Sequence, residues 1–262
     1  MVDSIQALWL GVIQGLTEFL PVSSSGHLVL AQKLLGLKEP ALLFDVSVHV
    51  GTLLAVVVYF WPDLWSMVRG LWARDQQGRQ GRRLLWLVVA GSVPTALLGL
   101  FLKDWFEAMF ASTAAVGVAL VITGGLLLAT RWLPPGDRGL ERTGAGRAFL
   151  VGLAQGLAIT PGISRSGSTI SVGLMLGLER RLAAHFSFVL SVPAILGALL
   201  LQLLHLDAAR QVALAPLLVG AAASALTGYL ALRFLLRVVQ RGKLHLFAPY
   251  CLLLGIAALL FF

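Results

Sequence analysis

Three side chains able to do acid–base or anion chemistry lie in otherwise apolar stretches: Glu18, His27 and Arg165. An imidazole near a serine can act as a general base or protonate a leaving oxygen. A guanidinium offers a fork of donors that suits phosphate oxygens. Ionisable groups in membrane segments are costly to bury, so they indicate function by default. The structural alternatives are that Glu18 only pairs with a neighbouring cation and that His27 is a satisfied core histidine.

Two thirteen-residue segments, 14–26 and 155–167, resemble each other although they lie 141 positions apart. Each is an apolar helix broken by proline, at Pro21 and at Pro161, and followed by serine and glycine. The first segment holds Glu18, and the second holds Arg165 at the position that corresponds to Ser24. The two copies therefore predict one polar site divided between two segments.

The serines after each break begin a second half-helix. A serine in this place is an ordinary N-cap, which accounts for at least one of the three in the first copy. Free N–H groups at a helix N-terminus also bind anions, phosphate above all. Two such termini that face each other would form a phosphate cradle, for which the candidates are Ser23, Ser24, Ser25, Gly26, Ser164, Arg165, Ser166, Gly167 and Thr169. Asp45 and His49, one turn apart, either support this site or make a polar contact between helices.

The composition is that of a multi-span membrane protein. The chain is 58% hydrophobic and 12% charged, against roughly 25% charged in soluble domains. Its mean hydropathy is +0.88. The net charge of +8 arises from short basic segments between apolar runs. Membrane topology explains that pattern better than nucleic-acid binding does.

Six apolar runs are long enough to cross a membrane, which takes about 20 residues. They are 41–61, 84–102, 113–133, 185–205, 212–232 and 246–262. The repeat segments instead form pairs of short runs, 6–20 with 27–36 and 148–159 with 169–178. We expect each pair to be a re-entrant helical hairpin, whose irregular tip must be buried in protein or line a cavity.

The basic residues test this topology. If both hairpins return to their side of entry, fifteen of the twenty Lys and Arg residues share one face. If each segment crosses once, the split is ten to nine. The excess of Lys and Arg marks the cytoplasmic side, so the first arrangement is predicted, with both termini periplasmic. The fifteen are Arg69, Arg74, Arg79, Arg82, Arg83, Arg131, Arg138, Arg142, Arg147, Arg180, Arg181, Arg233, Arg237, Arg241 and Lys243, against Lys33, Lys38, Lys103 and Arg210.

The predicted fold is an all-α integral membrane domain, 1–262, of two inverted-topology repeats. Repeat one is 1–133, the linker 134–147 and repeat two 148–262, and each repeat has one hairpin and three spans. A weaker similarity between 91–99 and 220–228 supports the duplication. Inverted repeats with broken helices place a shared site near the membrane midplane. Gly11 with Gly15, and Gly152 with Gly156, have the spacing typical of close helix packing.

The motif from Gln14 to His27, together with Pro161 to Thr169, closely resembles the undecaprenyl-diphosphate phosphatase family, also called the bacitracin-resistance family. The resemblance covers the chain in length and segment order. It implies a bacterial inner-membrane enzyme that removes the terminal phosphate of undecaprenyl diphosphate and so recycles the carrier lipid for cell-wall synthesis. It also implies dependence on a divalent cation, Mg²⁺ or Ca²⁺. Gln14 and Glu18 fill the two positions of the family's acidic motif, the first with its uncharged alternative.

On this basis we expect four catalytic residues: Ser24, His27, Glu18 and Arg165. Ser24 is the preferred nucleophile, activated by His27; Ser23 and a metal-activated water are the alternatives. Glu18 and Gln14 would hold the cation, because hard cations take oxygen ligands. Arg165 would stabilise the transferring phosphoryl group.

A lipid transporter or flippase is the main alternative, since inverted repeats and broken helices are transporter features. A second lipid-phosphatase family has a related Ser-Arg motif with a following histidine, but Ser171 stands at that position here. The expected partners are undecaprenyl diphosphate and membrane lipid, with a homodimer as the candidate assembly and no nucleic acid.

Overall fold

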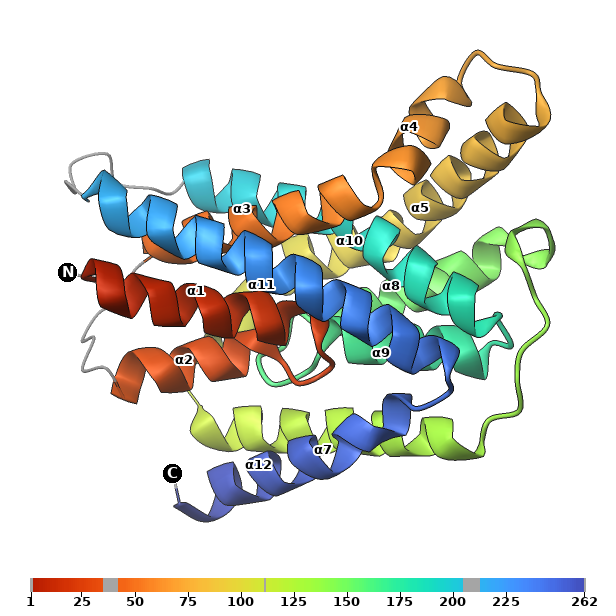
Figure 1. Cartoon of the computed structure of the whole chain (residues 1–262). Coiled ribbons are helices and arrows are strands. Elements are labelled where there is room, and N and C mark those ends of the chain that lie inside the picture. Colours follow the sequence, from red (N-terminus) through yellow and green to blue (C-terminus); the bar gives the residue numbers. More distant parts are fainter. Residues whose placement is uncertain (1, 35–41, 111, 205–212, 262) are drawn as a thin grey trace.

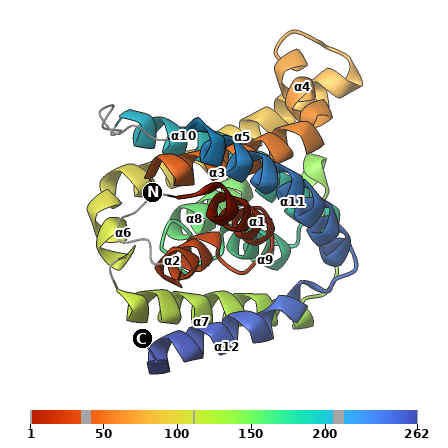
Figure 2. The ribbon, with the colours of Figure 1, turned by 60° about the vertical axis from the view of Figure 1, so that its left-hand side comes forward.

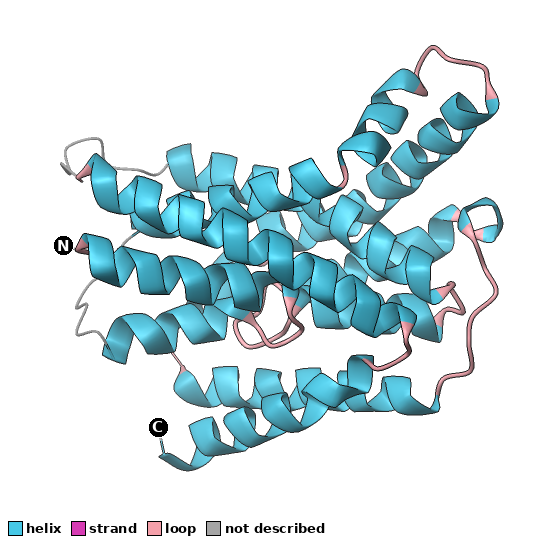
Figure 3. Ribbon diagram, viewed as in Figure 1, coloured by secondary structure: helices cyan, strands magenta, loops and turns pink. Residues whose placement is uncertain are grey.

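The computed structural model describes residues 2–34, 42–110, 112–204 and 213–261, and the secondary structure of these residues is helical (Figure 3). Short 3₁₀ turns, η1 Thr130–Trp132, η2 Leu140–Arg142 and η3 Leu244–Phe247, accompany the α-helices. The α-helices are α1 Ser4–Phe19, α2 Ser24–Leu34, α3 Leu42–Tyr59, α4 Trp61–Arg69, α5 Gln76–Phe101, α6 Lys103–Phe110, α7 Thr113–Ala129, α8 Ala145–Leu157, α9 Arg165–Met175, α10 Arg180–Leu204, α11 Leu214–Gln240 and α12 Ala248–Phe261.

The described residues include five helical segments that are long and apolar enough to cross a membrane. They are α5, α7 with η1, α10, α11 and η3 with α12. A sixth results if α3 and α4, bent by 70° where they meet, count as one span. This confirms an all-helical integral membrane protein whose long helices coincide with the predicted apolar runs. Lys38 and Arg210, two of the four basic residues predicted on the periplasmic face, lie outside the described residues, as does His205.

The two predicted helix breaks are confirmed. Helix α1 ends at Phe19, just before Pro21, and α8 ends at Leu157, before Pro161. Proline cannot donate a backbone hydrogen bond and its ring clashes with the preceding turn, so both helices stop there. The following half-helices α2 and α9 have 11 residues each, or roughly 17 Å at about 1.5 Å per residue. That length is about half of the roughly 30 Å hydrocarbon layer.

The half-helices approach the centre of the bundle from opposite ends (Figure 1). Helices α1 and α2 extend inward from the end where both termini lie, and α8 and α9 extend inward from the other end. Figure 2 shows the four of them enclosed by α3, α5, α7, α10, α11 and α12. The loops at 70–75 and 133–144 and the start of α10 also lie at the end opposite the termini.

Glycines set how closely the half-helices pack against the long helices. Helix α1 packs against α11, and α8 packs against α5. A Cβ built on Gly152 of α8 would lie 1.8 Å from the carbonyl oxygen of Gly91 in α5. A Cβ on Gly11 of α1 would lie 2.4 Å from the carbonyl oxygen of Gly220 in α11. The predicted role of these glycines in close helix packing is therefore confirmed.

Candidate active site

The break between α1 and α2 is a tight turn built around Ser23. This residue has φ 68°, in the left-handed region that non-glycine residues rarely occupy. Its carbonyl oxygen accepts a hydrogen bond from the ring Nδ1 of His27 at 2.7 Å, and its hydroxyl lies 3.2 Å from that of Ser25. The turn places Ser24 at the start of α2, facing back toward the end of α1.

A small polar cluster forms around the Glu18 carboxylate. The Ser24 hydroxyl donates to Glu18 Oε2 at 2.6 Å, and the side-chain amide of Gln14 donates to the same oxygen at 3.1 Å. Gln14 and Glu18 lie one turn apart on α1, so they share a face, and both are buried. The amide oxygen of Gln14, Oε1, is buried without a partner among the described residues.

The break between α8 and α9 is held by α7. The hydroxyl of Thr123 donates to the carbonyl oxygen of Gly162 at 3.1 Å and accepts from the amide of Ser164 at 3.1 Å. Gly162 has φ +95°, and a Cβ there would lie 2.5 Å from the carbonyl oxygen of Val116, so the turn requires glycine. Ser164 then caps α9 by accepting from the amide of Gly167 at 3.1 Å.

The two tips touch, and an ion pair joins them. Arg165 Nη2 lies 2.8 Å from Glu18 Oε1, and these side chains are 14% and 8% exposed. The amide of Gly162 also donates to the Ser23 hydroxyl at 3.2 Å. The second guanidinium nitrogen of Arg165, Nη1, is buried without a partner in the described parts of the chain. Glu18 and Arg165, 147 positions apart, thus meet beside the Ser24 hydroxyl.

His27 lies beside this cluster but is oriented away from Ser24. Its Nδ1 contacts a carbonyl oxygen, which only accepts, so Nδ1 carries the hydrogen. In the neutral ring Nε2 is then an acceptor, and the hydroxyl of Tyr250 donates to it at 2.6 Å. The two rings also stack, with centroids 5.7 Å apart and 14° between their planes. The geometry differs from the predicted Ser24–His27 pair, because Ser24 is bonded to Glu18 instead.

The predicted phosphate-binding residues fall into two groups. Ser23, Ser25 and Gly26 lie at the first tip, and Ser164, Ser166 and Gly167 at the second. Their hydroxyls are bonded within or between the tips: Ser23 to Ser25 and Gly162, and Ser164 to Ser166 and Gly167. The Thr169 hydroxyl instead donates to the Arg165 carbonyl and contacts that of Ser187 on α10. Thr169 therefore holds the backbone of Arg165 through its carbonyl oxygen.

Two residues at the site were missed by the sequence reasoning. Thr123 stands in a wholly apolar span and Tyr250 follows Pro249 at the start of another, and neither belongs to the repeated motif. The only signal available was that a threonine or a tyrosine in a membrane helix needs a hydrogen-bond partner. His49, for which the sequence leaves two roles open, donates from Nδ1 to the Asp45 carbonyl oxygen at 2.7 Å.

Comparison with known proteins gives one consistent result. The family model described as bacitracin resistance protein BacA matches residues 7–257. A protein of Desulfosudis oleivorans is 50% identical over 97% of this chain and 96% of its own, and one of Carboxydothermus hydrogenoformans is 47% identical over 98% and 97%. A third, from Methanosphaera stadtmanae, is 40% identical over 99% and 98%. All three are named undecaprenyl-diphosphatase. The chain belongs to the bacitracin resistance protein BacA family.

Proposed function

We propose that this protein hydrolyses undecaprenyl diphosphate to undecaprenyl phosphate and inorganic phosphate. The relatives that share 40–50% of its sequence carry the name of that activity. The observation that carries the proposal is the convergence of a nucleophile, a carboxylate and a guanidinium at the contact between two helix breaks. Ser24, Glu18 and Arg165 are linked there by hydrogen bonds of 2.6 and 2.8 Å. The reaction recycles the carrier lipid on which peptidoglycan is assembled.

The chain is proposed to consist of two inverted repeats, 1–133 and 148–262, joined by 134–147. The packing supports this, because α1 of the first repeat crosses α11 of the second, and α8 of the second crosses α5 of the first. The crossing points on α5 and α11 are Gly91 and Gly220, which begin the similar segments 91–99 and 220–228. In this proposal the half-helices are re-entrant, and each repeat covers the hairpin of the other.

The proposed location is the bacterial inner membrane, with both termini in the periplasm. The fifteen basic residues of one predicted face belong to segments at the end of the bundle opposite the termini (Figure 1). An excess of Lys and Arg marks the cytoplasmic side. The homodimer stays a prediction.

Substrate binding begins with Arg165. The terminal phosphate competes with Glu18 for the guanidinium, whose Nη1 is already without a partner among the described residues. Charge-assisted pairs between Arg and phosphate are among the stronger hydrogen bonds. The carboxylate released from Arg165 is 2.6 Å from the Ser24 hydroxyl, within reach of its proton. Binding of the anion thereby prepares the base.

In the first chemical step, Ser24 Oγ attacks the terminal phosphorus and its proton passes to Glu18. The bond between this phosphorus and the bridging oxygen breaks, so undecaprenyl phosphate leaves with that oxygen. Arg165 and the N-terminus of α9 stabilise the charge that spreads over the phosphoryl oxygens. Water then hydrolyses the phosphoserine, which releases phosphate and restores the Ser24 hydroxyl. Ser23 is the weaker nucleophile because it is buried and its hydroxyl is bonded to Ser25 and Gly162.

His27 has a positioning role in this mechanism. Both ring nitrogens have partners, Ser23 and Tyr250, so the ring is not available to Ser24 in this arrangement. Its Nδ1–H donates to the carbonyl oxygen of Ser23, the one non-glycine residue with positive φ among the described residues. The strained turn sets the direction of Ser24, since Ser24 follows it directly. Glu18 therefore replaces His27 as the proposed base.

A divalent cation, Mg²⁺ or Ca²⁺, fits the residues present. No group of three or more His, Cys, Asp or Glu side chains suited to a metal occurs in the described residues. Gln14 Oε1 is a buried acceptor without a described partner, and Glu18 is one turn away. These two would hold a cation that takes its other ligands from water and the diphosphate, as Mg²⁺ commonly does. When bound, the cation would neutralise charge on the phosphates.

The test is phosphate release from undecaprenyl diphosphate by the purified protein in detergent, with and without EDTA. We expect release that EDTA abolishes and that Ser24→Ala and Arg165→Ala lose. Brief reaction with substrate labelled in the terminal phosphate should leave label on Ser24. Release by Ser24→Ala at the wild-type rate would exclude the covalent route, and lipid movement without hydrolysis by wild type would favour a transporter.

A further inference from the structure

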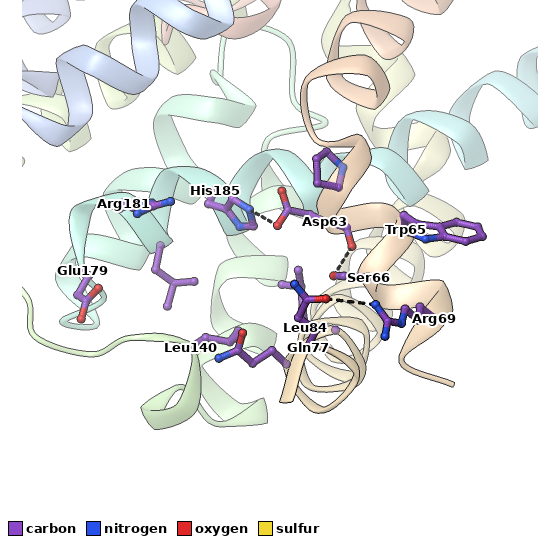
Figure 4. A pocket seen from close by; sticks show the side chains of 14 residues that line it. Asp63, Trp65, Ser66, Arg69, Gln77, Leu84, Leu140, Glu179, Arg181 and His185 are labelled. Atoms are coloured by element: carbon purple, nitrogen blue, oxygen red, sulfur yellow. Dashed lines mark hydrogen bonds and ion pairs between the residues drawn. The ribbon is translucent and has the colours of Figure 1, made fainter. Parts of the chain in front are cut away.

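A polar cavity lies away from the hairpin tips, at the arginine-rich end of the bundle. It has a volume of about 740 Å³, within the range of small-molecule sites. Its walls are α4, the start of α5, the first turns of α10 and Leu140 of η2 (Figure 4). The 70° bend between α3 and α4 creates this space, because α4 and the start of α5 project away from the bundle (Figure 1). None of its lining residues belongs to the proposed active site.

Three of the five ionisable side chains in the cavity wall, Asp63, Arg69 and His185, already have a partner. Asp63 Oδ1 lies 3.0 Å from Nε2 of His185, across the space between α4 and α10. Arg69 is held by Asp75 at 2.6 Å and by Gln77 at 3.2 Å. These contacts hold α4 to α10 and to the start of α5, so Asp63, His185 and Arg69 already have partners.

Two charged side chains in the cavity wall are free. Glu179, directly before α10, and Arg181, in its first turn, are exposed, and their side chains have no hydrogen-bond or ion-pair partner within the described ranges. In Figure 4 both lie on the α10 side of the cavity, across from Trp65 and Arg69 on α4. The free groups are one carboxylate and one guanidinium, so a ligand that satisfies both must carry a cationic donor and an anionic acceptor. A purely anionic ligand would leave Glu179 uncompensated.

Apolar side chains also line the wall, on the part of the chain where a membrane surface is expected. Leu84, Leu140 and Leu182 line the cavity beside Trp65, which is 54% exposed. Trp61, at the start of α4, and Trp72, in the loop after it, are also exposed, at 58% and 64%. Tryptophans gather at the interface between lipid and water, and arginines at the cytoplasmic side. The surroundings favour an amphiphile whose polar head enters from the interface.

We propose that the cavity between α4 and α10 binds the zwitterionic phosphoethanolamine head group of a membrane lipid, with its phosphate on Arg181 and its ammonium on Glu179. A primary ammonium can donate hydrogen bonds to Glu179, which a choline group cannot. A glycerol head group lacks the positive charge altogether. The site is separate from the phosphatase chemistry and needs no step of it.

The first experiment compares three lipids with identical acyl chains, carrying ethanolamine, choline or glycerol head groups. Native mass spectrometry of the purified protein gives the dissociation constant of each. The ethanolamine lipid should bind about tenfold more tightly than the other two, as expected for one charge-assisted hydrogen bond. Equal binding of all three lipids overturns the proposal.

Variants of the two free residues then separate their roles. Glu179→Gln should remove the preference for ethanolamine over choline, whereas Arg181→Gln should weaken all three lipids by about tenfold. Glu141→Gln and Arg241→Gln, which change charges at the same end but outside the cavity wall, should bind like wild type. All four variants should release phosphate from undecaprenyl diphosphate at the wild-type rate, which would show that they are folded. An unchanged preference in Glu179→Gln overturns the proposal.

A competition arm distinguishes a lipid from a free compound with the same head group. Soluble O-phosphoethanolamine should displace the lipid only at far higher concentration, because it lacks the acyl chains that contact the apolar wall. Displacement at equal concentration would overturn the lipid assignment and assign the cavity to a soluble compound.

Discussion

The ion pair between Glu18 and Arg165 allows a quantitative test of how the two hairpins are joined. The charges are about 4 Å apart when Nη2 and Oε1 are 2.8 Å apart, which gives roughly 4 kcal/mol at an effective dielectric constant of about 20. Both side chains are less than 15% exposed, so solvent screens the pair little. Removing one partner of a buried pair leaves an uncompensated charge and costs about 3–5 kcal/mol.

The variants Glu18→Gln, Arg165→Met and the double variant form a thermodynamic cycle. We expect Glu18→Gln to cost more than Arg165→Met. In Glu18→Gln the buried guanidinium loses the one described anion that compensates its charge, whereas in Arg165→Met the carboxylate keeps hydrogen bonds from Ser24 and Gln14. The double variant should be about 2–4 kcal/mol more stable than the sum of the two single losses predicts.

The free energy of unfolding, from denaturant titration of the protein in detergent, measures this coupling. Phosphate release is expected to vanish in all three variants, including any whose stability recovers. Additive stability losses within about 0.5 kcal/mol would refute the reasoning, because uncoupled residues do not form the contact that joins the tips. Wild-type activity in the double variant would refute the assignment of both residues to the reaction.

Three further predictions concern the neighbours of the site. The variant Tyr250→Phe keeps the ring stack but removes the hydrogen bond to His27 Nε2. In steady-state kinetics kcat should therefore fall about fivefold to tenfold with little change in KM. An unchanged kcat would contradict this. Gly152→Ala should lower the free energy of unfolding by about 1–3 kcal/mol, while Gly125→Ala, with nothing within 4 Å of its Cβ, should match wild type; equal unfolding of the two variants would contradict the close packing. The variant Thr123→Val removes two hydrogen bonds from the second tip. It should lower the free energy of unfolding by about 2–4 kcal/mol and raise KM. A variant as stable as wild type would exclude this anchoring role.

The helices and most of the polar side chains at the candidate site follow from local patterns in the sequence. Apolar runs of helical length predict membrane helices whatever their neighbours are, because the lipid core requires every backbone group to be paired within the segment. Proline at 21 and 161 ends a helix through its own ring and missing N–H. Glu18 and Arg165 stood out because a charge in an apolar segment is costly unless it has a partner. These properties are local, because each depends on a residue and its neighbours along the chain.

The partner of each of these side chains follows instead from how the helices pack together. The sequence placed His27 three residues after Ser24, yet the turn at Ser23 directs Ser24 to Glu18 and His27 to Tyr250, which is 223 positions away. Thr123 and the cavity beside α4 likewise depend on how helices cross and bend. Such contacts depend on crossing angles and rotamers that no local pattern encodes. Local patterns thus identify the polar side chains at the candidate site, and the packing of distant helices sets which partner each of them contacts.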